Sequence, residues 1–116
     1  MADWPDQMLH IVRQTCIVEV RSNHPDLTLR QLGVLLLVYL TDEMETVRGL
    51  AKQLNIARSV ITRVLNRLEE IKLVRRTINE MDRRSVLIAR TSSGAAMMER
   101  LGATMTEAAR ALHNAA

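Results

Sequence analysis

The chain has 116 residues, 47% hydrophobic and 25% charged, so it is long enough for one folded domain, and wholesale disorder is excluded. One Trp, one Tyr and no Phe imply an aliphatic core and argue against modules that stack single-stranded bases on aromatic side chains. The net charge of +3 is unevenly spread: residues 46–90 hold eleven Lys/Arg against four Asp/Glu, a pattern typical of a nucleic-acid-binding face.

A first helix is predicted over Trp4 to Ser22. Pro5 suits its first turn, Asp3 or Asp6 suits its positive end, and Asn23-His24-Pro25 ends it. Apolar positions alternating four and three residues apart give it one stripe, formed by Trp4, Met8, Ile11, Thr15 and Val18.

A second helix is predicted to begin after Thr28, because Thr28 and Gln31 have the spacing of a capping box. Its body, Leu32 to Leu40, is apolar almost all round. A helix without a polar face is buried on all sides, so we expect this to be the central core helix.

Two short helices then form a predicted helix-turn-helix. Thr46 caps the first, Asn55 suits a left-handed turn, and the second runs from about Arg58 to Ile71. The second helix of such a pair lies in the major groove of DNA. Its inner positions are Ile61, Val64, Leu65, Leu68 and Ile71, and its outer positions are Arg58, Ser59, Thr62, Arg63, Asn66 and Arg67.

The outer face of this helix carries the predicted DNA contacts. Ser59, Thr62 and Arg63 lie one turn apart and can reach the same few base pairs, and Arg63 suits a bidentate contact to guanine. Contacts to phosphates are expected from Arg58, Asn66 and Arg67. Arginines on one helix face are often merely solvated, but here net charge and motif agree on DNA.

A β-hairpin follows, with strands predicted over Leu73 to Ile78 and Ser85 to Arg90 and a polar turn between them. Arg83 and Arg84 lie at its tip, where a thin ribbon can place arginines in a narrow minor groove. Asp82 beside them is expected to hold an arginine in position or to close the turn.

A last helix is predicted from Ser92 or Ser93. Its heptad seam consists of Gly94, Met98, Leu101, Met105, Ala108 and Leu112. A single seam needs a partner, and we expect it to pack on the first helix and on a second copy of the chain. The predicted dimer interface comprises Met8, Ile11, Met98, Leu101, Met105 and Leu112.

The sequence offers no recognisable catalytic set, glycine-rich phosphate loop or metal-ligand spacing, so we expect neither an enzyme nor a metal or other cofactor. It has no recognisable signal peptide, and its longest apolar run, Leu32 to Leu40, is too short for a membrane span. Cys16 lies in an apolar stretch and is interpreted as a buried, inert cysteine rather than a redox switch. A cytoplasmic protein, associated with the nucleoid when bound to DNA, is expected.

Three blocks resemble the MarR family of bacterial transcription regulators. Residues 54–76 (LNIARSVITRVLNRLEEIKLVRR) resemble the recognition-helix block of that family. Residues 82–94 (DRRSVLIARTSSG) resemble its wing and the start of its last helix. Residues 27–36 (LTLRQLGVLL) resemble its second helix. The resemblance implies that Ser59, Thr62 and Arg63 read the groove and that Asp82 and Arg84 form the wing motif Asp-x-Arg. It also implies a homodimer on a palindromic site, usually a repressor relieved by a small phenolic or oxidant signal.

Four features depart from the family pattern. Val60 replaces a polar groove residue and suggests an apolar contact to a thymine methyl group. Ala57 replaces a helix cap, at a cost of about 1 kcal/mol. Lys72 replaces a glycine before the first wing strand. The chain is also short, which weakens the expectation of a ligand pocket more than that of DNA binding.

The sequence thus predicts a mainly α, α+β winged helix with a two- or three-stranded wing. Residues 1–116 form a single domain in this interpretation, with a DNA-binding core at 27–91 and dimerisation helices at 4–22 and 92–113. The predicted function is a homodimeric repressor that binds double-stranded DNA through helix 58–71 and wing 79–85, with a small-molecule effector as an open possibility and no membrane partner. Two alternatives are a winged helix that binds proteins and an architectural DNA-binding protein without an effector.

Overall fold

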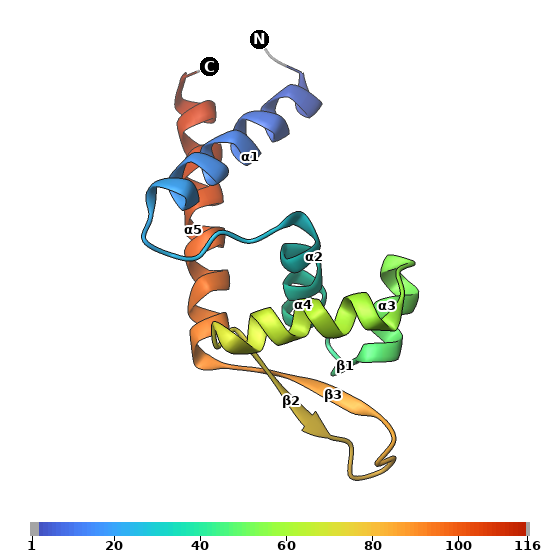
Figure 1. The fold of residues 1–116 in the computed structure, drawn as a ribbon. Helices are drawn as coiled ribbons and strands as arrows, with labels where there is room; N and C mark the ends of the chain where they lie inside the picture. The colour runs from blue at the N-terminus through green and yellow to red at the C-terminus, as the bar shows by residue number, and fades with distance from the viewer. Residues whose placement is uncertain (1–2, 116) are drawn as a thin grey trace. The chain divides into compact units, whose positions relative to one another are not determined.

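The computed structural model describes residues 3–115. The helices and strands follow one another as α1 (Trp4–Arg21), α2 (Leu29–Leu40), β1 (Glu45–Thr46), α3 (Val47–Leu54), α4 (Arg58–Glu70), β2 (Val74–Ile78), β3 (Val86–Arg90) and α5 (Ser92–Ala115) (Figure 1). They form two compact units: Leu27–Ala96 is one, and the other joins the residues up to Asp26 with those from Met97 onward. The mainly helical winged-helix fold predicted from the sequence is confirmed.

The Leu27–Ala96 unit contains a three-stranded antiparallel sheet in the order β1–β3–β2. Thr46 of β1 pairs with Leu87, and the hairpin register runs from Val74 opposite Arg90 to Ile78 opposite Val86. The two long strands were predicted within one residue of their ends. The two-residue β1 was not predicted as a strand, because the sequence there carries only the signal of a helix cap.

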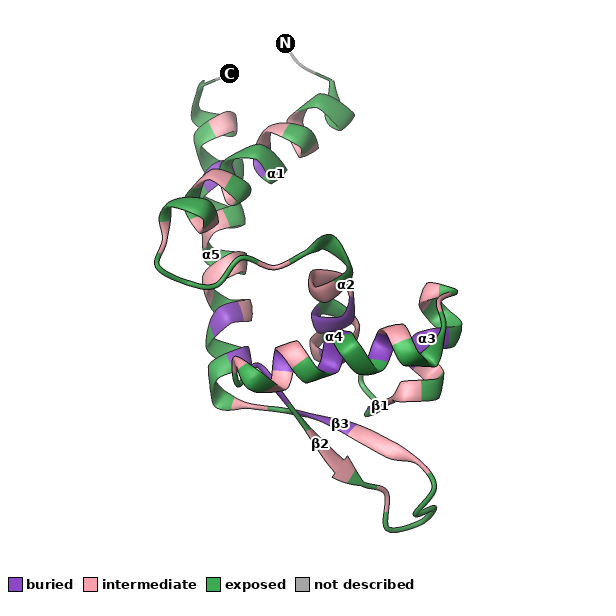
Figure 2. Cartoon of the chain, in the orientation of Figure 1, coloured by how far each residue is buried: buried purple, intermediate pink, exposed green. Residues whose placement is uncertain are grey.

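The core of this unit is aliphatic. Its largest fully buried side chains come from α2, α3, α4, β2 and β3, and they are Val34, Leu35, Leu50, Ile61, Leu65, Leu68, Val74 and Ile88. Figure 2 shows buried and exposed residues interleaved along α4, as expected of an amphipathic helix.

The prediction that α2 is buried on all sides is wrong. Val34, Leu35 and Val38 are buried, but Leu36 is 38% exposed and Leu40 is 75% exposed. In the described chain α2 packs against α4 and β3, which leaves an apolar side of the helix uncovered. The apolar sequence of α2 therefore correctly indicated a helix that contributes to the core. It did not indicate that one apolar side of this helix is exposed in the described chain.

The predicted helix caps of this unit are present. Thr28 and Gln31 form the reciprocal capping box of α2, with distances of 3.1 and 2.9 Å. The Thr46 hydroxyl accepts the Gly49 N–H at 2.9 Å at the start of α3, and Asn55 ends α3 in the left-handed region at φ 54°. These side chains satisfy backbone groups that a helix terminus leaves without partners.

The junction between the sheet and α5 is closed by Tyr39. Its hydroxyl donates to the Leu73 carbonyl at 2.7 Å and accepts the Thr91 N–H at 3.0 Å. Gly94, in the first turn of α5, lies so close that a Cβ there would overlap both the Tyr39 hydroxyl and the Leu73 carbonyl oxygen. Glycine is therefore required at this position by close approach.

Arg90, at the end of β3, caps the C-terminus of α2. Its Nε donates to the Val38 carbonyl at 3.0 Å and its Nη2 to the Thr41 carbonyl at 2.7 Å, while the guanidinium lies 5.7 Å from the centroid of the Tyr39 ring. A cation at these carbonyls is favoured by the helix dipole. Arg90, one of the basic residues of the segment 46–90, therefore has a structural role at the end of α2.

In the other unit, α1 begins and ends close to its predicted bounds. Asp3 caps it by accepting the Asp6 N–H at 3.1 Å. Glu19 of α1 pairs with Arg100 of α5 at 3.2 Å, so the two helices of this unit are joined by an ion pair. Among residues 3–115, no helix is both long and apolar enough to cross a membrane.

The predicted interface residues of this unit differ in exposure. Ile11 is buried and Met105 is 42% exposed, while the half-buried ones are Met8, Met98, Leu101 and Leu112. Further large apolar residues are exposed on α1: Trp4, Leu9, Val12 and Val20. Cys16 is also exposed, so the prediction of a buried cysteine is wrong. It lies five residues after Ile11 and therefore about 140° around the helix from that buried position.

Candidate nucleic-acid interface

The turn between α3 and α4 is built by backbone hydrogen bonds around Asn55. The Asn55 N–H donates to the Lys52 carbonyl at 3.3 Å and the Ile56 N–H to the Ala51 carbonyl at 3.1 Å, which is a Schellman arrangement. α4 then begins after Ala57, which makes no side-chain cap hydrogen bond. This short turn fixes the direction in which α4 leaves α3.

The outward face of α4 is polar and exposed. Ile61, Val64, Leu65 and Leu68 are buried on the inner face, so the polar residues of α4 lie on the side away from the core. The exposed residues of α4 are Arg58, Ser59, Thr62, Arg63, Asn66 and Glu70. The Thr62 hydroxyl donates to the Arg58 carbonyl at 3.0 Å, which fixes its rotamer on this face.

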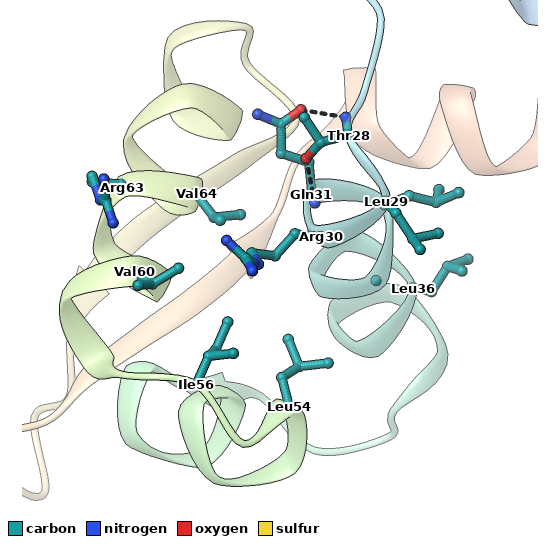
Figure 3. A pocket seen from close by; sticks show the side chains of 12 residues that line it. Thr28, Leu29, Arg30, Gln31, Leu36, Leu54, Ile56, Val60, Arg63 and Val64 are labelled. Atoms are coloured by element: carbon teal, nitrogen blue, oxygen red, sulfur yellow. Dashed lines mark hydrogen bonds between the residues drawn. The ribbon is translucent and has the colours of Figure 1, made fainter.

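One flank of this face borders a groove of about 870 Å³ between α4 and α2. Figure 3 shows Val60 and Val64 on the α4 side of the groove, with Arg30 reaching across from α2. Arg63 also lines it, so this arginine stands between the groove and the outward face. Val60 is half-buried here and does not line the hollow on the opposite flank.

The opposite flank borders a hollow of about 450 Å³ between α3, α4 and the wing. Arg58 and Thr62 of α4 line it together with Asp82 and Arg84 of the wing. The fold thus brings together predicted residues that are twenty or more positions apart in the sequence. Arg48 of α3 lines the same hollow. Sequence reasoning did not single it out, and its place in the basic segment was its only signal.

The wing tip is organised by Asp82 and Asn79. The Asp82 carboxylate accepts the Arg84 N–H at 3.2 Å and lies 3.5 Å from Arg84 Nε, while the Asp82 N–H donates to the Asn79 carbonyl at 3.1 Å. Asp82 thus both closes the turn and contacts an arginine. The Arg84 side chain nevertheless remains 94% exposed, and Arg83 Nη1 lies 3.7 Å from the Glu80 carboxylate.

The wing is fastened to α4 by Glu69 and Arg76. The Glu69 carboxylate accepts the Arg76 backbone N–H at 3.1 Å and two guanidinium N–H groups at 3.0 and 2.8 Å. These bonds, first the backbone one and then the side-chain ones, hold the pKa of Glu69 below its ordinary value of 4.5. Arg76 therefore joins strand β2 to helix α4.

Arg67 also has a partner inside the chain. Its Nη1 lies 3.0 Å from the Glu70 carboxylate on the same helix, and its side chain is 43% exposed. The predicted contact residues of α4 therefore differ in their surroundings. Arg58, Ser59, Thr62, Arg63 and Asn66 are exposed, whereas Arg67 is paired with Glu70. A net positive surface with exposed Ser, Thr, Asn and Arg side chains can bind phosphates and base edges.

Comparison with known proteins places this geometry in context. The sequence profile of the MarR family matches residues 27–86, more than half of the chain. Among curated proteins, none matches the chain in sequence.

Solved structures with the same fold include the MepR–DNA complex of S. aureus, with a TM-score of 0.74, 24% identity, and coverage of 90% of this chain and 85% of that one. A cysteine-to-serine mutant of MarR from E. coli, complexed with operator DNA, has a TM-score of 0.68, 24% identity, and coverage of 91% and 70%. The transcriptional regulator Tm0710 from Thermotoga maritima has a TM-score of 0.71, 20% identity, and coverage of 95% and 72%.

Proposed function

The chain belongs to the MarR family of DNA-binding transcription regulators, and we propose that it is a homodimeric repressor that binds a palindromic operator. Two copies of α4 would enter successive major grooves about 34 Å apart, and the wings would contact the flanking minor grooves. The protein would then act in the cytoplasm, on the nucleoid, and as a binding protein rather than an enzyme.

The observation that carries this proposal is that the exposed polar face of α4 and the wing line a common hollow. Arg63 is exposed on α4, and Arg58 lines a common hollow with Arg84. Related folds, MepR and MarR, were solved with DNA, which supports the same use of this surface here. We assign base contacts to Ser59, Val60, Thr62 and Arg63, and phosphate or minor-groove contacts to Arg58, Asn66, Arg67, Arg83 and Arg84.

We assign dimerisation to the helices at 4–22 and 92–113. The exposed apolar side chains of α1, with Trp4 at 69% and Val20 at 70% exposure, support a second copy, because such surfaces mark interaction sites. Met105 of the heptad seam is exposed as well. Sedimentation of the purified protein tests this assignment, and a monomer at all concentrations contradicts it.

The experiment that tests the DNA proposal is binding to a duplex from the upstream region of the protein's own gene, against a scrambled duplex, over a salt series. We expect the scrambled duplex to bind weaker by roughly 10³-fold or more. Equal and steeply salt-dependent binding to both would favour an architectural role. Lack of binding to either at low salt would favour a protein-binding winged helix.

A second candidate function, response to a small-molecule effector, is favoured by the groove between α2 and α4. Its volume of about 870 Å³ lies within the range of ligand pockets, ~300–1,000 Å³, and it combines apolar side chains with Arg30 and Arg63. An organic anion held there by Arg63 would compete with DNA for that residue. Titration of 2-hydroxybenzoate into the protein–duplex complex tests this: we expect release of DNA that Arg30→Ala reduces, and a complex that resists it indicates a regulator without this effector class.

A further inference from the structure

The hollow between α3, α4 and the wing collects cations from three separate elements. Arg48 of α3, Arg58 of α4 and Arg84 of the wing all line its volume of about 450 Å³. Asp82 is the one acidic residue in its lining. Its carboxylate lies 3.5 Å from Arg84 Nε, so it offsets one of the three positive charges and leaves two in excess.

Of the three hydroxyl-bearing residues that line the same hollow, Thr46, Thr62 and Ser85, the two threonines have different hydrogen bonds. The Thr46 oxygen accepts the Gly49 N–H at 2.9 Å, which leaves the hydroxyl proton available for an acceptor outside the helix. The Thr62 hydroxyl instead donates to the Arg58 carbonyl at 3.0 Å. The hollow therefore offers guanidinium groups and a neutral donor, which suit a tetrahedral oxyanion.

We propose that this hollow binds one backbone phosphate of the DNA duplex and that Arg48 holds this phosphate together with Arg58. The inference rests on the proposed function and makes it more specific. If α4 lies in a major groove and the wing in the adjacent minor groove, the DNA strand between them must pass over the hollow that separates the two elements. A phosphate held at that point would fix the register of both contacts at once.

Lys52 provides a matched control for Arg48. It is exposed on the same helix one turn later and does not line the hollow. Arg48→Gln and Lys52→Gln therefore remove the same charge from the same helix. For Arg48→Gln we expect the slope of log K against log salt to become shallower by about 0.9 per subunit, or about 1.8 for the dimer, with similar losses on cognate and scrambled duplexes. For Lys52→Gln we expect a markedly smaller change in slope.

A duplex series with single neutral methylphosphonates locates the phosphate. In the wild type, one substitution between the two groove contacts should weaken binding, and in Arg48→Gln the same substitution should cause little further loss. Arg48→Lys, which keeps the charge but loses the planar fork, should fall between wild type and Arg48→Gln. Circular dichroism of each variant checks that the fold is intact.

The outcomes separate this inference from the proposed function. If the wild type binds the duplex but Arg48→Gln changes the salt slope no more than Lys52→Gln does, the proposed phosphate site is wrong. The proposed function as a DNA-binding regulator is then unaffected. The phosphate site is also wrong if every methylphosphonate substitution weakens binding of Arg48→Gln as much as it weakens binding of the wild type. If the wild type binds no duplex at all, both the site and the proposed function are overturned.

Discussion

Glu69 of α4 accepts three hydrogen bonds from a single residue of the wing, Arg76. One comes from the backbone, so the contact holds strand β2 itself and not only a mobile side chain. Helix α4 and the wing are thereby fixed to each other within the Leu27–Ala96 unit.

Glu69→Gln should lower the free energy of unfolding near neutral pH by about 1 kcal/mol, since hydrogen bonds to charged groups are stronger than neutral ones but solvent screens this partly exposed pair. The pKa of Glu69 is lowered in the folded state, so its contribution is complete above the ordinary value of 4.5 and is lost as the pH falls through the lower folded pKa. Urea titrations should show that the difference between wild type and variant shrinks below pH 4.5. A difference that stays constant down to pH 2 would contradict this.

Lys72→Gly should stabilise the protein. Lys72 has φ 67° at the end of α4, a left-handed conformation that favours glycine. Relief of this backbone strain should raise the free energy of unfolding by about 1–2 kcal/mol. The greater freedom of glycine in the unfolded chain offsets part of this gain. Lys72→Ala keeps the strain and serves as the control. In chemical denaturation, the free energy of unfolding of Lys72→Gly should exceed that of Lys72→Ala by about 1 kcal/mol. Equal stability of the two variants would count against strain at this position.

Gly94→Ala and Gly102→Ala should have opposite effects although both lie in α5. A Cβ at Gly94 meets the Tyr39 hydroxyl and the Leu73 carbonyl, and relieving that overlap should cost about 1–3 kcal/mol. A Cβ at Gly102 meets nothing within 4 Å, and alanine there should gain about 0.5–1 kcal/mol of helix stability. Thermal unfolding of both variants is the measurement, and the same sign for both would show the packing argument to be mistaken.

Arg63→Ala should weaken binding to a specific site by about 1–3 kcal/mol and relax the preference at one base position. Arg67→Ala, at a position assigned to phosphate, should weaken all sequences alike. Selection of duplexes from a randomised pool measures both. An unchanged sequence preference in Arg63→Ala would remove the assignment of this residue to base readout.

Arg84→Ala should weaken binding and reduce the salt slope by about one per subunit, with little change in the preference for major-groove bases. Its side chain is 94% exposed at the wing tip and has one contact of 3.5 Å, so the substitution should leave stability unchanged. Arg75→Ala removes an exposed arginine from the neighbouring strand as a control. Loss of sequence preference without loss of affinity would contradict a minor-groove role.

Local signals predicted the elements of the DNA-binding unit well. The Thr28–Gln31 capping box and the left-handed Asn55 depend on neighbouring residues, and both are present as predicted. The long strands and α4 were located within one residue of their ends because hydrophobic period and turn chemistry agree there.

Features that depend on distant residues were not predictable. The surroundings of Arg48 and Arg76 are set by elements that meet only in the folded chain, as are the pairing of β1 with β3 and the exposure of Leu36. A sequence reports that a residue is basic or apolar, but whether it faces solvent, a hollow or a carboxylate is decided by what packs beside it.

The chain carries a single tryptophan and a single tyrosine, and they belong to different compact units. Trp4 is 69% exposed on α1, so its fluorescence should report any partner that covers that helix. The Tyr39 hydroxyl is bonded at the junction of the sheet and α5, so its absorbance should follow the opening of that junction. Two intrinsic optical probes can thus follow association and unfolding separately, without any added label.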